Sequence, residues 1–117
     1  MTKRGYRLFI EDILDSMHMI EEYIHDLDHQ NFSADRKTID AVIRNIEIIG
    51  EAARNIPESI RKKYPSIPWK QMIGLRNITI HTYFGVDLDI IWRIVTVNIP
   101  EAKTEILKML DSLHDEP

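Results

Sequence analysis

Apolar side chains recur at alternating intervals of three and four residues along most of this chain. That spacing places them on one face of an α-helix, because an α-helix turns once in about 3.6 residues. No segment shows the sustained two-residue alternation of a β-strand. The stripes comprise Ile10, Ile13, Met17, Ile20, Ile24 and Leu27, then Ile39, Val42, Ile46, Ile49, Ala53 and Ile56, and finally Ile99, Ala102, Ile106, Met109 and Leu113. The pattern predicts an all-α fold, an antiparallel bundle of four or five helices joined by short loops.

Polar residues and prolines mark where the first two helices end. Residues 28–33 form a polar connector after the first stripe, and Ser33 is the N-cap that we expect for the second helix. The tripeptide Asn-Ile-Pro at 55–57 ends that helix, since proline disfavours the helical conformation in the residue before it. The connectors are short, so consecutive helices are predicted to run antiparallel.

The second half of the chain is divided by prolines and an aspartate. Residues 64–68 contain two prolines and predict a rigid link. A third helix is expected from Trp69 to about Tyr83, and Asp87 can cap the next one. Pro100 then either kinks that helix or splits it near Asn98, because proline cannot donate the helical hydrogen bond.

Length and composition limit the class of protein. The 117 residues suit one domain spanning 1–117. There are no cysteines, which excludes disulfides, thiolate metal ligands and cysteine nucleophiles and is typical of a reducing cytoplasm. No apolar run approaches the ~18 residues that a membrane span needs. Carboxylates at 11, 12 and 15 interrupt the N-terminal apolar residues, so no signal peptide is predicted. We therefore expect a cytoplasmic protein without a membrane partner.

Charge is distributed unevenly. The net charge of −4 argues against a broad, non-specific nucleic-acid binder. Residues 11–31 hold seven carboxylates and no Lys or Arg, whereas 61–76 hold five cations and no carboxylate. Two solvated helix faces would explain this, but we favour a local positive patch that includes Arg61, Lys62 and Lys63.

Two glycines, Gly50 and Gly74, lie inside helical patterns, where each costs about 1 kcal/mol relative to alanine. Gly50 opens a run of small residues, 50–53, around one carboxylate, Glu51. Small side chains allow another helix to approach closely, which is the interpretation that we favour. The alternative is that Glu51 lines a functional site or a dimer seam.

Residues 74–84 read GLRNITIHTYF and carry several polar side chains in an apolar helical pattern. Buried polar groups need partners, so such a concentration indicates a functional site. Arg76 can hold phosphate charge, and His81 can move protons near neutral pH. On an ideal helix the two lie about 140° apart. Either the helix loosens before His81, or the site is assembled from two chains of a twofold dimer.

Three segments, taken together, resemble one known family. They are GLRNITIHTYFGVD at 74–87 with Trp69 before it, IIGEAA at 48–53, and the residues VDL, IW and IP between 86 and 100. In this order and spacing they resemble the HEPN-domain proteins of the HepT type, which are ribonuclease toxins. The similarity extends from about residue 6 to 113.

The resemblance implies a fold, an activity and a regulator. HepT-like proteins are all-helical homodimers with a composite site in the dimer cleft. The family's catalytic arginine and histidine fall on Arg76 and His81, and its polar residue after the arginine falls on Asn77. With Asn77 and Glu51 in support, we expect RNA cleavage without a metal or cofactor, because the RNA 2′-hydroxyl is itself the nucleophile. The basic residues Arg61, Lys62 and Lys63 would guide RNA toward the cleft. The resemblance also implies a type VII toxin–antitoxin system. There a cognate MntA-like nucleotidyltransferase antitoxin transfers AMP onto Tyr83, and the added negative charge opposes RNA binding.

Two other functions fit parts of the sequence. The bundle could be a non-catalytic binding partner of a nucleotidyltransferase, with Arg76 and His81 as contact residues. It could also hold a carboxylate-bridged dimetal site, because Glu22 and His25 have the Glu-x-x-His spacing. That site needs a second such motif, which the sequence lacks, and both residues flank the apolar stripe. We therefore expect no metal.

Overall fold

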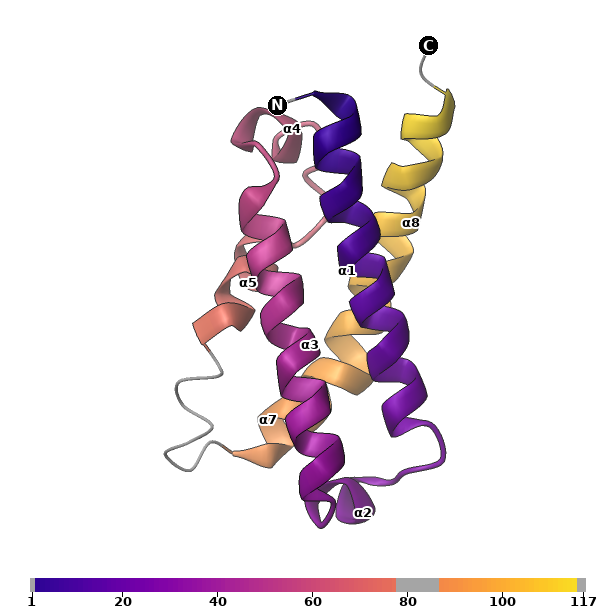
Figure 1. The fold of residues 1–117 in the computed structure, drawn as a ribbon, viewed down its shortest axis with the longest axis vertical. Helices are drawn as coiled ribbons and strands as arrows, with labels where there is room; N and C mark the ends of the chain where they lie inside the picture. The colour runs from indigo at the N-terminus through magenta and orange to yellow at the C-terminus, as the bar shows by residue number, and fades with distance from the viewer. Residues whose placement is uncertain (1, 78–86, 116–117) are drawn as a thin grey trace.

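The computed structural model of the chain describes residues 2–77 and 87–115, and all regular elements within these ranges are helical. They are α1 (Lys3–Ile24), α2 (His29–Ser33), α3 (Arg36–Asn55), α4 (Glu58–Arg61), α5 (Trp69–Gly74), the 3-10 helix η1 (Leu75–Asn77), α7 (Leu88–Arg93), the π-helix η2 (Ile94–Asn98) and α8 (Ile99–Asp115). Helix α1 packs on α3 and α8, and these three run along the long axis (Figure 1). The predicted all-α bundle is confirmed. No helix in the described ranges is both long enough and apolar enough to cross a membrane.

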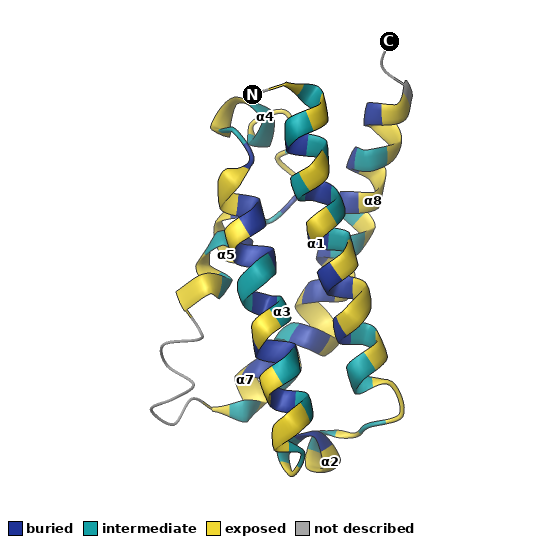
Figure 2. Cartoon of the chain, in the orientation of Figure 1, coloured by how far each residue is buried: buried dark blue, intermediate teal, exposed yellow. Residues whose placement is uncertain are grey.

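The predicted apolar stripes form the core. Every member of the second and third stripes is buried, and the first stripe is fully buried from Ile10 to Ile20. In Figure 2 the buried positions follow the inner faces of α1, α3 and α8. Each fully buried aliphatic side chain contributes about 1.5–3 kcal/mol relative to an exposed one, so these faces account for most of the drive to fold.

The polar connector at 28–33 differs from the prediction because it contains a helix. Asp28 caps α2 by accepting a hydrogen bond from the Asn31 N–H at 2.7 Å, and Phe32 is fully buried. The N-cap of α3 is Asp35 and not Ser33, which is the last residue of α2. Asp35 accepts from the Thr38 N–H at 3.1 Å and the Thr38 hydroxyl at 2.7 Å.

The structure describes residues 69–77 of the predicted third helix. They form the α-helix α5, which ends at Gly74, and then the 3-10 turn of η1, so the continuous α-helix that we predicted is interrupted there. Glycine is a poor helix former, and a 3-10 turn is a common way to end an α-helix. The remainder of the predicted helix, 78–83, lies outside the described residues. Both α5 and η1 lie against α3, and this contact positions the candidate site.

Pro100 bends the C-terminal helix without splitting it. The chain stays helical from α7 through η2 into α8, and the π-helical turn ends just before the proline. A wider turn accommodates a ring that would otherwise clash with the carbonyl four residues earlier. Helix α7 lies across the base of the bundle and α8 rises beside α1 (Figure 1). As predicted, Asp87 caps α7, accepting from the Asp89 N–H at 2.9 Å.

Candidate functional site

Arg76 forms an ion pair with Glu51 where η1 meets α3. The Arg76 Nε and the Glu51 Oε2 lie 3.1 Å apart, and the two side chains are 46% and 50% exposed. The two residues are 25 positions apart in the sequence, so only the packing of η1 on α3 brings them together. A guanidinium in this position is fixed at one side and open to solvent, and can therefore receive a phosphate oxygen.

Gly50, the neighbour of Glu51, explains how close η1 comes to α3. A Cβ placed on Gly50 would lie 2.8 Å from the Arg76 backbone nitrogen and 3.1 Å from the Met72 carbonyl oxygen. Real Cβ atoms do not approach backbone atoms at the shorter of these distances. Glycine is therefore required for this close contact, which confirms at Gly50 the predicted close packing of another helix.

The other predicted site residues are only partly accounted for. Asn77 follows Arg76 in η1 and is exposed, and its supporting role stays a prediction. His81 and Tyr83 lie outside the described residues. Their assigned roles, and the angle between Arg76 and His81, remain predictions.

The structure does not bring the predicted basic cluster to Arg76. Arg61 donates from Nε to the Ile56 carbonyl at 3.0 Å and so satisfies the end of α3. Lys62 lies 3.6 Å from Glu58, and Lys63 is exposed. Helix α4, where the cluster begins, lies near the N-terminal end of the bundle, whereas α5 leads away from that end (Figure 1).

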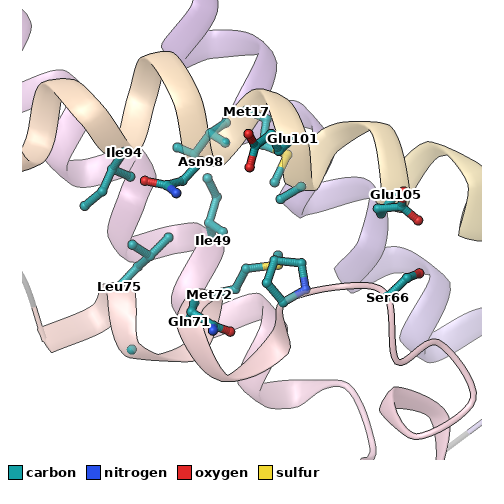
Figure 3. A pocket seen from close by; sticks show the side chains of 14 residues that line it. Met17, Ile49, Ser66, Gln71, Met72, Leu75, Ile94, Asn98, Glu101 and Glu105 are labelled. Atoms are coloured by element: carbon teal, nitrogen blue, oxygen red, sulfur yellow. The ribbon is translucent and has the colours of Figure 1, made fainter.

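A groove of about 750 Å³ lies on the other side of α5, between α5 and α8. Apolar side chains from α1, α3, α5, η1, η2 and α8 form its floor, and polar groups from the 64–68 link, α5, η2 and α8 form its rim (Figure 3). The residues that line it include Met17, Ile49, Met72, Leu75, Ile94, Asn98, Ile99 and Glu101. Sequence reasoning missed this groove. Gly74 lies in the groove wall, and among the described residues no atom outside its own helix lies within 4 Å of an added Cβ, but its sequence context alone does not show this.

One end of the groove carries a carboxylate whose pKa is lowered. The Ser66 hydroxyl donates a hydrogen bond to Glu105, and this bond is the main reason that the pKa of Glu105 lies below its ordinary value. Lys108, whose Nζ lies 3.2 Å from the carboxylate, lowers the pKa further. Ser66 and Glu105 face each other from the link and from α8 (Figure 3).

Glu22 and His25, which we considered for a dimetal site, each contact a different residue. Glu22 lies 3.3 Å from His18, and His25 lies 3.4 Å from Asp26, in each case with both side chains more than half exposed. Within residues 2–77 and 87–115, no three His, Asp or Glu side chains group closely enough to hold a metal ion.

The fold and the Arg76–Glu51 pair define an all-α bundle protein with an arginine site at a helix contact. More specifically, the chain belongs to the ribonuclease HepT-like family, whose pattern matches residues 13–109. It is 45% identical over 106 residues to the Methanocaldococcus jannaschii protein named "Putative RNase MJ1380", covering 91% of this chain and 97% of that protein. It is 41% identical over 107 residues to "Probable ribonuclease HepT" of Thermococcus cleftensis, covering 92% and 97%. No solved structure gives a significant match.

These comparisons confirm the resemblance that the sequence motifs indicated. The matched span of 97 residues includes α3, α5 and η1, and so contains both members of the Arg76–Glu51 pair. Membership of this family supports a ribonuclease function, and RNA is the substrate that fits it.

Proposed function

We propose that this chain is a metal-independent endoribonuclease whose catalytic groups are Arg76 and His81, contributed by two copies of the chain to one cleft. The observation that carries this proposal is the family match over residues 13–109. The half-exposed guanidinium at the α3–η1 contact supports it, because a group that binds phosphate must be both held and accessible.

The reaction needs no group beyond the RNA and the protein. The RNA 2′-hydroxyl attacks the adjacent phosphorus, and the bond from phosphorus to the 5′-oxygen breaks. A neutral imidazole removes the proton from the 2′-hydroxyl, and a protonated imidazole supplies one to the leaving 5′-oxygen. Arg76 stabilises the charge that develops on the phosphate oxygens. Two copies of His81 in a twofold cleft provide both imidazoles, and Asn77 orients one of them or the RNA.

The proposal includes regulation within a type VII toxin–antitoxin system. A cognate MntA-like nucleotidyltransferase transfers AMP from ATP to the Tyr83 hydroxyl and releases pyrophosphate. The added phosphate places negative charge in the segment that also carries Arg76 and His81, and so disfavours RNA binding. Intact-mass and peptide mass spectrometry after co-expression test this step. A gain of whole AMP units on Tyr83 is expected, and modification elsewhere or none would contradict it.

The experiment that tests the catalytic assignment compares the wild-type chain with His81→Ala on a mixed RNA substrate in the presence of EDTA. The wild type should cleave the RNA, and His81→Ala should not, while both retain the same oligomeric state in sedimentation. Cleavage by both proteins would remove His81 from the mechanism. Failure of the wild type to cleave any RNA would instead favour the binding-only partner of a nucleotidyltransferase.

A further inference from the structure

One turn of α3 contacts Arg76 in two different ways. Gly50 lies against its backbone, and Glu51 pairs with its guanidinium. We propose that Glu51 is a positioning residue that fixes the direction of the Arg76 side chain, while Gly50 fixes the place of its backbone. The consequence for RNA cleavage rests on the proposed function above.

The backbone part of this arrangement is held by the core. Gly50 is buried and lies between Ile49 and Ala53, which are fully buried on the same helix. An added Cβ on Gly50 would also come within 3.2 Å of the Arg76 Cβ. The two helices cannot move closer together or farther apart without disturbing the core. The position of the Arg76 backbone, from which its side chain extends, is therefore set by α3.

Stability does not explain the ion pair between the Glu51 and Arg76 side chains. Ordering an arginine side chain costs rotamer freedom. An ion pair between half-exposed groups is weak, so this pair adds little to folding. Orientation is a different matter, because a misplacement of about 1 Å can cost about 100-fold in rate. The pair is therefore best explained as a means of aiming the guanidinium.

The geometry of the pair is compatible with phosphate binding. The closest approach of Glu51 is to Nε, and not to the two terminal nitrogens that grip a phosphate in a bidentate way. The carboxylate also carries negative charge close to where RNA would bind, so it opposes binding. A positioning role therefore predicts opposite effects on removal of the charge: slower cleavage, but equal or tighter RNA binding.

The test compares Glu51→Gln with Glu47→Gln in the full-length protein. Glu47 lies one turn earlier on α3 and pairs with Arg44 at 3.8 Å, so its variant makes the same charge change without touching Arg76. Single-turnover cleavage, RNA affinity, the pH–rate profile and the melting temperature are measured for both. The Nε–Hε NMR signal of Arg76 reports side-chain order independently of activity.

For Glu51→Gln we expect a cleavage rate about 10–100-fold lower, an RNA dissociation constant that is equal or smaller, and an unchanged pH–rate profile. The Arg76 signal should move to the position of a free arginine. Glu47→Gln should resemble the wild type in every measurement.

Two outcomes for Glu51→Gln would overturn the inference. One is an Arg76 signal at the wild-type position, and the other is an Arg76 signal at the position of a free arginine together with a wild-type cleavage rate. A lost limb of the pH profile would make Glu51 an acid or base instead. If the wild type cleaves no RNA, the proposed function fails, and the NMR signal alone decides whether Glu51 orders Arg76.

Discussion

On its α3 side, the segment from Trp69 to Asn77 lies so close to Gly50 that an added Cβ would meet backbone at 2.8 Å. On its α8 side, the same segment borders a groove, and an added Cβ on Gly74 would meet no described residue outside its own helix within 4 Å. The two glycines look alike in the sequence, since each interrupts an apolar helical pattern. One is required by packing and the other is not. A helical glycine therefore becomes informative only when the surface that it faces is known.

The difference separates two kinds of surface. The α3 side holds Arg76 and Glu51 in a contact that other parts of the core constrain. The α8 side has an apolar floor with polar groups along its rim, and α5 makes no comparable contact with α8. Substitutions on the α3 side should therefore change catalysis, stability or both, whereas substitutions of exposed residues on the α8 side should be tolerated. The predictions below test this difference.

The largest effect is expected from a pair of alanine substitutions on opposite sides of the segment. Arg76→Ala should lower the cleavage rate about 10²–10³-fold, because a charge-stabilising donor is removed. Gln71→Ala, in the exposed groove wall, should leave the rate within about twofold, as for other surface changes. Single-turnover assays with matched melting temperatures measure both. Equal losses would show that the two sides do not differ in function.

The second prediction concerns the two glycines. Gly50→Ala should destabilise the fold by about 1–3 kcal/mol, because the methyl group overpacks the contact with Arg76 and Met72. Gly74→Ala should stabilise it by up to about 1 kcal/mol, since alanine is the better helix former and the space is open. Urea unfolding measures the free energy of both variants. Stabilisation by Gly50→Ala would mean that the α3 contact is looser than the structure shows.

Much of the fold follows from periodicity, but its local details do not. Burial repeats with the helical turn, so the stripes predict the buried faces directly. The choice of Asp35 over Ser33 as N-cap does not follow, because both residue types cap helices well. Phe32 is buried as part of the separate helix α2, whose last residue is Ser33, and the N-cap of α3 is therefore Asp35. The change from α-helix to 3-10 helix after Gly74 likewise occurs against another helix, beside Gly50.

The candidate site shows the same limit. Arg76 and its motif are visible in the sequence, and Glu51 stands out as a carboxylate among small residues. That they form a pair could not be predicted, since nothing in their spacing fixes which face of α3 meets η1. Arg61 shows this limit in another way. Its charge suggested RNA binding, which stays a prediction, but did not reveal that its Nε donates to the Ile56 carbonyl at the end of α3. A sequence shows charge but not the partner that occupies it.

A third, smaller effect should come from the basic cluster, which lies away from both sides of the segment. Lys62→Glu combined with Lys63→Glu should weaken RNA binding. The slope of the log binding constant against log salt concentration should fall in magnitude by about 0.7 for each RNA phosphate that the cluster no longer neutralises. The cleavage rate of bound RNA should be unchanged. The control is Arg36→Glu with Lys37→Glu, the same charge change in the first turn of α3. An equal salt slope in the cluster variant and the wild type would exclude the cluster from RNA binding.

The smallest effect is predicted at the end of the groove, where Ser66 donates to Glu105. Ser66→Ala should raise the pKa of Glu105 toward its ordinary value, and the remaining depression should come from Lys108. The folded-state pKa is the lower one. The stability that this bond contributes is therefore fully present above the unfolded glutamate pKa of about 4.3 and is lost as pH falls through the folded value.

Carboxyl-carbon NMR titration measures this pKa directly in the wild type and in Ser66→Ala. Asp35 provides the internal control, because its pKa is lowered by hydrogen bonds from the Thr38 side chain and backbone in the first turn of α3. Its titration should be the same in both proteins. A Glu105 titration that does not move would mean that the link and α8 are not joined in solution. The groove would then be open at this end, and the contrast between the two sides of the segment would be greater still.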